Sequence, residues 1–140
     1  MRVLLDTDVL LDVILARAPF VQAASALLDL SEQGAFEAYI CAITPLNICY
    51  IARKAQSSGA LKQAIADLLR KTRVCSINHS TLASALTSSI NDYEDAVQHA
   101  CAVADQLDAI VTRNVDDYKN ATLPIFTPTD LLNHLQSQQP

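Results

Sequence analysis

Acidic side chains stand next to the short apolar runs of this sequence, where they could bind a divalent cation. Asp6 directly follows one such run, and residues 112–117 (Thr-Arg-Asn-Val-Asp-Asp) follow another. A third acidic group opens the helical pattern that leads into the second run. In an open parallel sheet, ligands bind beyond the carboxyl ends of the strands. The oxygen-bearing side chains that we expect at this edge are Asp6, Asp92, Asp95, Asn114, Asp116 and Asp117.

Several carboxylates in one cleft repel one another unless some are protonated or cations lie between them. Ligand sets made only of oxygen suit Mg²⁺ or Mn²⁺ rather than zinc. Such ions can activate a water molecule and stabilise the leaving oxygen in phosphodiester cleavage. Each group also has a purely structural interpretation, as a helix cap or as a turn. Capping alone does not require all three groups to lie at strand ends, so the pattern favours a metal site.

Short apolar runs alternate with helical patterns along the whole chain. We expect strands at residues 2–5, 36–41, 74–77, 109–112 and 124–126. We expect helices at 9–17, from 19 toward Gly34, at 44–55, 61–71 and 81–87, and from Asp92 and Thr127 onward. Thr44 is the predicted N-cap of the third helix, with Pro45 as its first residue. This alternation predicts an α/β fold, a three-layer α/β/α sandwich with a roughly five-stranded parallel sheet.

The composition narrows the class of protein. The 140 residues are 51% hydrophobic and contain no linker or repeat, which indicates a single domain over residues 1–140. Two glycines are too few for a glycine-rich phosphate-binding loop. The four cysteines have no C-x-x-C spacing and are expected to be reduced core thiols. Acids interrupt the apolar N-terminus, so we expect a cytoplasmic protein without a membrane span.

The charges are unevenly distributed. The net charge is −5, but residues 53–73 hold six Lys and Arg and only one acid, a local balance of +5. The rest of the chain then carries −5 − 5 = −10. Such a basic segment beside the acids, a basic flank, could bind the phosphates of a polyanion while carboxylates hold a metal ion. The alternative is that these cations are the solvated faces of two helices.

Three segments together resemble the PIN domain: VLLDTDVLLDVI at the N-terminus, DYEDAVQHACA at 92–102 and AIVTRNVDDYKNATLPIFTP at 109–128. The resemblance implies a PIN-like fold and a Mg²⁺- or Mn²⁺-dependent endoribonuclease that cleaves RNA. Many bacterial members are VapC-like toxins of toxin–antitoxin pairs. It therefore also implies a homodimer and a small antitoxin protein as partner.

The resemblance implies roles for individual residues. Asp6 matches the first metal-binding acid, Asp95 the acid of the central helix and Asp117 the nearby carboxylate, for which Asp116 could substitute. These four would bind the metal, and the first three would be catalytic. The implied supporting residues are Asn47, Asp92, Thr112 and Asn114, and the residues expected to contact RNA are Arg53, Lys54 and Arg113.

One departure bears on activity. The family usually places a glutamate in the helix after the second strand, where this chain has Asn47. None of its glutamates (Glu32, Glu37 and Glu94) is expected to fill that position. An amide brings no charge to a metal, so a catalytically weak or inactive module that binds RNA or protein is one alternative. A small haloacid-dehalogenase-type phosphatase is another, because Asp6-x-Asp8 also suits an aspartyl nucleophile with its acid two residues on.

Overall fold

The computed structural model describes all residues from Met1 to Pro140. A parallel sheet of five strands in the order β3-β2-β1-β4-β5 forms its centre. The strands are β1 (Arg2–Leu5), β2 (Glu37–Cys41), β3 (Arg73–Cys75), β4 (Ala109–Val111) and β5 (Ile125–Phe126). The predicted five-stranded parallel sheet is therefore confirmed.

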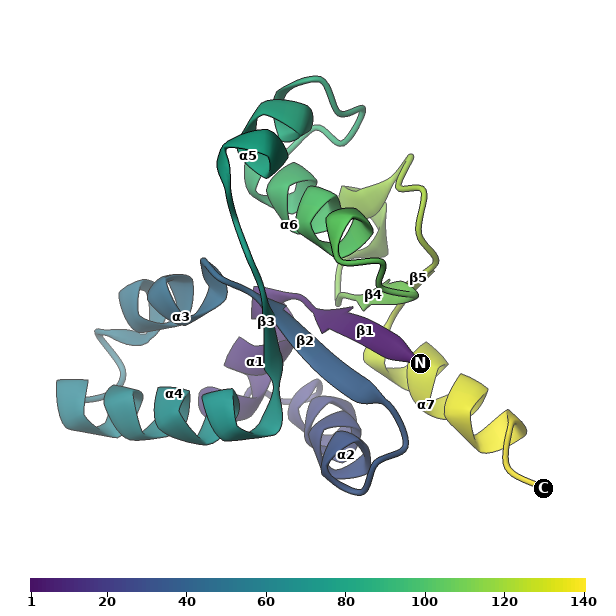
Figure 1. Cartoon of the computed structure of the whole chain (residues 1–140). Helices are drawn as coiled ribbons and strands as arrows, with labels where there is room; N and C mark the ends of the chain where they lie inside the picture. Colours follow the sequence, from purple (N-terminus) through teal and green to yellow (C-terminus); the bar gives the residue numbers. More distant parts are fainter.

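Helices cover both faces of the sheet (Figure 1). They are α1 (Thr7–Ile14), α2 (Val21–Glu32), α3 (Thr44–Ala52), α4 (Ser58–Lys71), α5 (His79–Leu86), α6 (Tyr93–Ala104) and α7 (Pro128–Ser137). A 3₁₀ turn, η1 (Val115–Tyr118), follows β4. One core joins the sheet to α1, α2, α3, α4 and α7, and the other joins it to α5 and α6. The three-layer α/β/α arrangement is thus as predicted.

The central strand explains why the first apolar run is continuous. Val3 and Leu5 point into the first core and Leu4 into the second, and all three are fully buried. Alternate residues of a strand face opposite sides of the sheet. A strand that is buried on both faces needs apolar side chains at every position, and not only at alternate ones.

The direction of the chain across the sheet reverses next to β1. From β1 the chain moves outward to β2 and β3, and it then crosses back to β4 and β5 on the other side. The amide of Asp6, which follows β1, donates to the carbonyl of Val111, the last residue of β4, at 2.9 Å. The ends of β1 and β4 thus lie side by side, at the point where open α/β sheets bind ligands.

Some helix ends differ from the prediction. Asp92 and Thr127 cap α6 and α7 as expected, and Gly34 has the left-handed φ of +84° that suits the end of α2. The prediction that Thr44 caps α3 is wrong, because Thr44 is the first helical residue. Its fully buried hydroxyl instead makes a 3.3 Å hydrogen bond with the hydroxyl of Thr7, so a contact between α3 and α1 replaces the cap.

The cysteines belong to the core, as predicted. Cys41, Cys75 and Cys101 are fully buried and all four thiols are free. None of the helices combines the length and the apolar character that a membrane span requires.

Candidate active site

Asp6 follows β1, lies beside the end of β4 and is the N-cap of α1. The residue is 6% exposed, and its carboxylate accepts three hydrogen bonds. Oδ1 accepts from the amide of Thr7 at 2.7 Å and from Nε2 of Gln98 at 3.1 Å, and Oδ2 accepts from the hydroxyl of Thr112 at 2.8 Å. Burial raises the pKa of Asp6 although these bonds oppose it. Since a carboxylate offers roughly four acceptor positions, Oδ2 keeps one for a further ligand.

Asp95 faces the same region from the first turn of α6. Its amide donates to Oδ1 of Asp92, the helix cap, at 3.1 Å. Partial burial raises the pKa of Asp95 to about 7, and the neighbouring negative charges add to this shift. In order of decreasing effect, these charges are those of Asp6, Asp92, Asp117 and Glu94. The charges of carboxylates from the α1 cap, α6 and η1 therefore affect one another, as expected when they share one edge of the sheet.

The turn after β4 presents Asp117. The amide of Asp117 donates to the carbonyl of Asn114 at 3.0 Å, and the amide of Asn114 donates to the hydroxyl of Thr112 at 3.1 Å. Tyr118 at the end of the turn is 1% exposed and packs in the second core. Asp116 is exposed on the same turn, and its charge is absent from those with the largest effect on Asp95. Asp117 is exposed as well, and of the two acids it is the one whose charge is among the largest effects on the pKa of Asp95.

Asn114 contacts an acid that the expected PIN-type site did not include. Its Nδ2 donates to Oδ2 of Asp8 at 3.0 Å, and Asp8 lies in the first turn of α1. The charge of Asp8 also raises the pKa of Asp6. From the sequence, Asp8 is expected only as the second acid of a phosphatase, although it is two residues from Asp6 and therefore near this edge.

Asn47 contacts the acidic region through Glu94. Its Nδ2 donates to Oε1 of Glu94 at 2.8 Å, which joins α3 to the first turn of α6. Partial burial raises the pKa of Glu94, and the charges of Asp6, Asp92 and Asp8 raise it further. Glu94 is not among the site residues expected from the sequence, because the family places its glutamate within the third helix. The available signal was that Glu94 adjoins Asp95.

The cations expected to contact RNA lie in different surroundings. Nη1 of Arg113 lies 3.6 Å from Oδ1 of the buried Asp12, and its guanidinium lies over the ring of Phe20 at 4.2 Å. Arg53 is exposed at the end of α3, with its guanidinium 3.9 Å from the ring centre of Tyr50. Lys54 beside it is also exposed. Arg113 is thus held by its own chain, whereas the other two side chains face solvent.

Part of the basic segment lies at the opposite edge of the sheet. Lys71 ends α4 just before β3 begins, so it lies at the amino edge, whereas Asp6 lies at the carboxyl edge. Its Nζ pairs with Glu32 at 3.5 Å, and Arg70 pairs with Asp67. For these residues the expectation of a basic flank beside the acids is wrong. The reason is that α4 carries the chain back across the sheet between β2 and β3.

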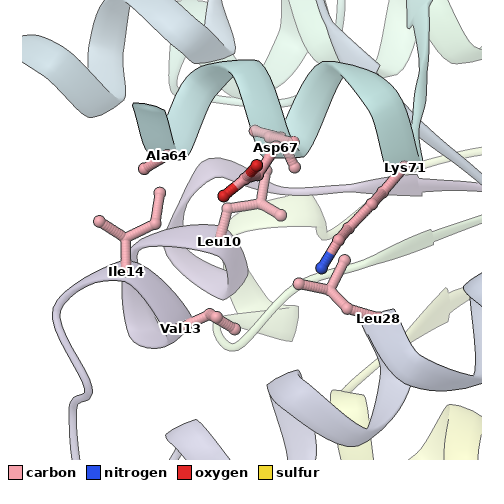
Figure 2. A pocket seen from close by; sticks show the side chains of 8 residues that line it. Leu10, Val13, Ile14, Leu28, Ala64, Asp67 and Lys71 are labelled. Atoms are coloured by element: carbon pink, nitrogen blue, oxygen red, sulfur yellow. The ribbon is translucent and has the colours of Figure 1, made fainter. Parts of the chain in front are cut away.

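A separate pocket of about 190 Å³ lies between α1, α2 and α4 (Figure 2). Its walls are mostly apolar, with Leu10 and Ile14 from α1 and Leu28 from α2. Asp67 and Lys71 of α4 are its polar lining residues. None of the acids at the carboxyl edge lines this pocket, so the acidic region is a different part of the surface.

The acidic side chains have the chemistry of a hard divalent site. Their ligand atoms are all oxygen, which suits Mg²⁺ or Mn²⁺, and a cation would relieve the repulsion that raises the pKa of Asp95. As the side chains stand, no three His, Cys, Asp or Glu residues are close enough together to hold an ion. The donor chemistry therefore fits a divalent cation, and binding would need the carboxylates to move closer together.

Comparison with known families identifies the class of protein. Residues 2–116 match the PIN domain family, and the chain therefore belongs to that family. PIN-domain proteins are generally nucleases. The phosphatase alternative belongs to a different family and is set aside.

Solved structures similar to this chain include toxin–antitoxin proteins. VapBC2 of Rickettsia felis, bound to a promoter DNA fragment, is 14% identical with a TM-score of 0.68, over 91% of this chain and 98% of that chain. A toxin–antitoxin complex from Klebsiella pneumoniae is 22% identical with a TM-score of 0.67, over 90% and 97%. FitAcB of Neisseria gonorrhoeae is 19% identical with a TM-score of 0.66, over 91% and 98%. At these identities the likeness concerns the fold alone. No curated protein sequence matches significantly.

Proposed function

We propose that this protein is a Mg²⁺- or Mn²⁺-dependent endoribonuclease that acts in the cytoplasm as the toxin of a toxin–antitoxin pair. The observation that carries the proposal is the pair of hydrogen bonds by which Thr112 joins the buried carboxylate of Asp6 to the turn that carries Asp117. Membership of the PIN family supports a nuclease, and the reversal of strand order beside Asp6 supports a ligand site at this edge.

Asp6, Asp95 and Asp117 are the residues that we propose to hold the metal, with Asp116 as a further candidate on the same turn. When bound, the ion would supply Lewis-acid stabilisation of the negative charge on the reacting phosphate and lower the pKa of water. The protein's own groups prepare this site. Thr112 holds Asp6 through Oδ2 and also accepts from the amide of Asn114, so one hydroxyl relates the two segments.

Asp92 and Asn114 have supporting roles in this proposal. The Asp92 cap fixes the first turn of α6, from which Asp95 projects. Asn114 orients Asp8 through its side-chain amide. Asp92 can thus position Asp95 without contacting the metal, and Asn114 holds Asp8 in the first turn of α1.

RNA is the proposed substrate, and the two exposed cations after α3, together with Arg113, are proposed to bind its phosphates. Lys54 is exposed and has no side-chain partner, whereas the exposed guanidinium of Arg53 also donates to the carbonyl of Tyr50. Arg113 is 25% exposed and pairs with Asp12, so it would offer only part of its guanidinium to a phosphate. A phosphate contact by any of these residues would weaken as the salt concentration rises.

A small antitoxin is the proposed protein partner. The Rickettsia, Klebsiella and Neisseria structures are toxin–antitoxin proteins of the same fold, and this chain matches nearly the full length of the chains compared. A bound antitoxin would hold the acidic edge inactive until it is released.

A homodimer is the proposed assembly, and exposed apolar side chains support it. Leu46 and Tyr50 lie four residues apart on α3 and are 66% and 67% exposed. Leu82 and Leu86 repeat this spacing on α5, and Leu86 is 72% exposed. Side chains four residues apart share one face of a helix, so each helix turns an apolar stripe outward. Apolar stripes of this kind are typical of protein–protein contacts.

Calorimetric titration with Mn²⁺ and an RNA cleavage assay, on wild type and on Asp95→Asn, test the proposed activity. We expect wild type to bind Mn²⁺ and cleave RNA, and the variant to lose both. Wild type that binds no Mn²⁺ at millimolar concentration would overturn the proposal.

A catalytically weak or inactive module that binds RNA or protein is the second candidate function. Asn47 favours it, because an amide takes the place of a charged ligand and would lower metal affinity. Metal binding without cleavage of any of a varied set of RNAs would support this candidate over the nuclease.

A further inference from the structure

Glu94 is held at the acidic edge by a residue from another layer of the fold. It belongs to the first turn of α6, but its carboxylate accepts a 2.8 Å hydrogen bond from Asn47 of α3. The two residues are 47 positions apart in the chain, so tertiary packing brings them together. A local helix contact would not produce this pairing.

The surroundings of Glu94 are unfavourable for a lone carboxylate. The negative charges of Asp6, Asp92 and Asp8 all act on it. An exposed glutamate at a helix surface is ordinarily free to rotate into water, where like charges are screened. The hydrogen bond to Asn47 instead keeps this side chain close to the other acids.

The chemical nature of Asn47 matters for the role of this pair. A lysine at this position would bring a positive charge to the glutamate, whereas the amide donates a hydrogen bond and brings no charge. Oε2 of Glu94 has no hydrogen bond to protein, so it is available to a cation. The pair therefore presents a fixed carboxylate oxygen that Asn47 does not neutralise.

We propose that Glu94 supplies a further carboxylate to the divalent-cation site and that Asn47 is the positioning residue that holds it there. This inference rests on the proposed metal-dependent function. Position 47 of α3 carries no charge, and Glu94 of α6, which Asn47 contacts, would supply the missing carboxylate. A site with Asp6, Asp95, Asp117 and Glu94 has four negative charges rather than three.

Glu94→Gln tests the inference with little change in shape. Glutamine keeps a carbonyl oxygen that can accept the hydrogen bond from Asn47, so the substitution removes the charge alone. We expect the Kd for Mn²⁺, measured by calorimetry, to rise about tenfold. The matched control is Glu37→Gln, since Glu37 begins β2 at the opposite edge of the sheet and should leave the Kd within about twofold.

Asn47→Ala tests the positioning role separately. It leaves the charge of Glu94 but removes the group that holds it, so the Kd for Mn²⁺ should rise about threefold to tenfold. Urea denaturation without metal checks folding, and there Glu94→Gln should be at least as stable as wild type, because a repelled charge is gone.

The outcomes separate this inference from the proposed function. If wild type binds Mn²⁺, Asp95→Asn does not, and Glu94→Gln binds as tightly as wild type, the role of Glu94 is wrong while the metal site stands. If Glu94→Gln binds Mn²⁺ more weakly than wild type but Asn47→Ala binds it as tightly as wild type, the positioning role of Asn47 is wrong. If wild type itself binds no Mn²⁺, the proposed function fails first.

Discussion

The hydroxyl of Thr112 donates a hydrogen bond of 2.8 Å to the carboxylate of Asp6, and both residues are buried although 106 positions separate them in the chain. This bond joins the end of β1 to the end of β4. The same hydroxyl accepts from the amide of Asn114, which begins the turn that carries Asp117. The side chain of Thr112 thus links Asp6 to the turn that carries Asp117.

Thr112→Val should destabilise the protein by about 1–3 kcal/mol, because a buried carboxylate loses a donor and the Asn114 amide loses its acceptor. Valine has nearly the same shape as threonine, so the packing changes little. Urea denaturation measures the loss. Thr129→Val is the matched control, because Thr129 is exposed on α7 and has no side-chain hydrogen bond in the structure; it should change stability by less than about 0.5 kcal/mol. Equal effects of the two substitutions would contradict the role of Thr112.

Asp95→Asn should stabilise the metal-free protein at pH 8. The pKa of Asp95 is about 7 in the folded protein and lies near 4 when unfolded. Between these values the folded state binds the proton more tightly, so wild type loses stability as the pH rises from about 4 to about 7. Solvent reaches part of the side chain and screens the repulsion, so we expect a difference of about 1 kcal/mol at pH 8.

Urea denaturation in the presence of a chelator, at pH 4 and at pH 8, checks this pH dependence. The two proteins should differ least at pH 4, where the acid is protonated in wild type. Added Mn²⁺ should stabilise wild type and leave Asp95→Asn unchanged, since only the folded wild type binds the ion. A variant that is less stable than wild type at pH 8 without metal would show that Asp95 is not repelled by its neighbours.

Asp117→Asn and Asp116→Asn distinguish the two acids of η1. The charge of Asp117 acts on Asp95, so its loss should lower RNA cleavage by about 100-fold, in line with the importance of a metal ligand. Asp116→Asn should retain activity within about threefold. Single-turnover cleavage of one RNA substrate by both variants provides the measurement. A larger loss from Asp116→Asn would assign the metal ligand to that residue instead.

Leu86→Glu should convert the proposed homodimer to a monomer. The side chain is 72% exposed, so the substitution costs the folded monomer little, but it places a charge in an apolar contact. Sedimentation velocity on wild type and variant measures the assembly. Leu69→Glu on α4 is the control, because Leu69 is 47% exposed and lies outside the proposed contact. A monomeric wild type, or a dimer that survives Leu86→Glu, would overturn this interface.

The strands, the helices and the edge of the sheet that carries the acids all follow from the sequence. Apolar runs such as Val3-Leu4-Leu5 and caps such as Asp92 are local signals, and they act within a few residues of where they stand. Because β1 and β4 are parallel, their carboxyl ends lie at the same edge of the sheet. Asp6 and the turn after β4 therefore lie side by side there. The acids expected there from the sequence were therefore predictable as a group.

The pairing of individual side chains was decided only by the tertiary structure. Asn47 reaches Glu94, Arg113 turns to Asp12, and Lys71 lies at the far edge of the sheet beside Glu32. None of these contacts follows from spacing, because each joins helices or loops whose relative position depends on how the helices pack on the sheet. Local sequence fixes which residues end a strand or begin a helix, whereas the angle and depth at which helices pack fix which of their side chains meet.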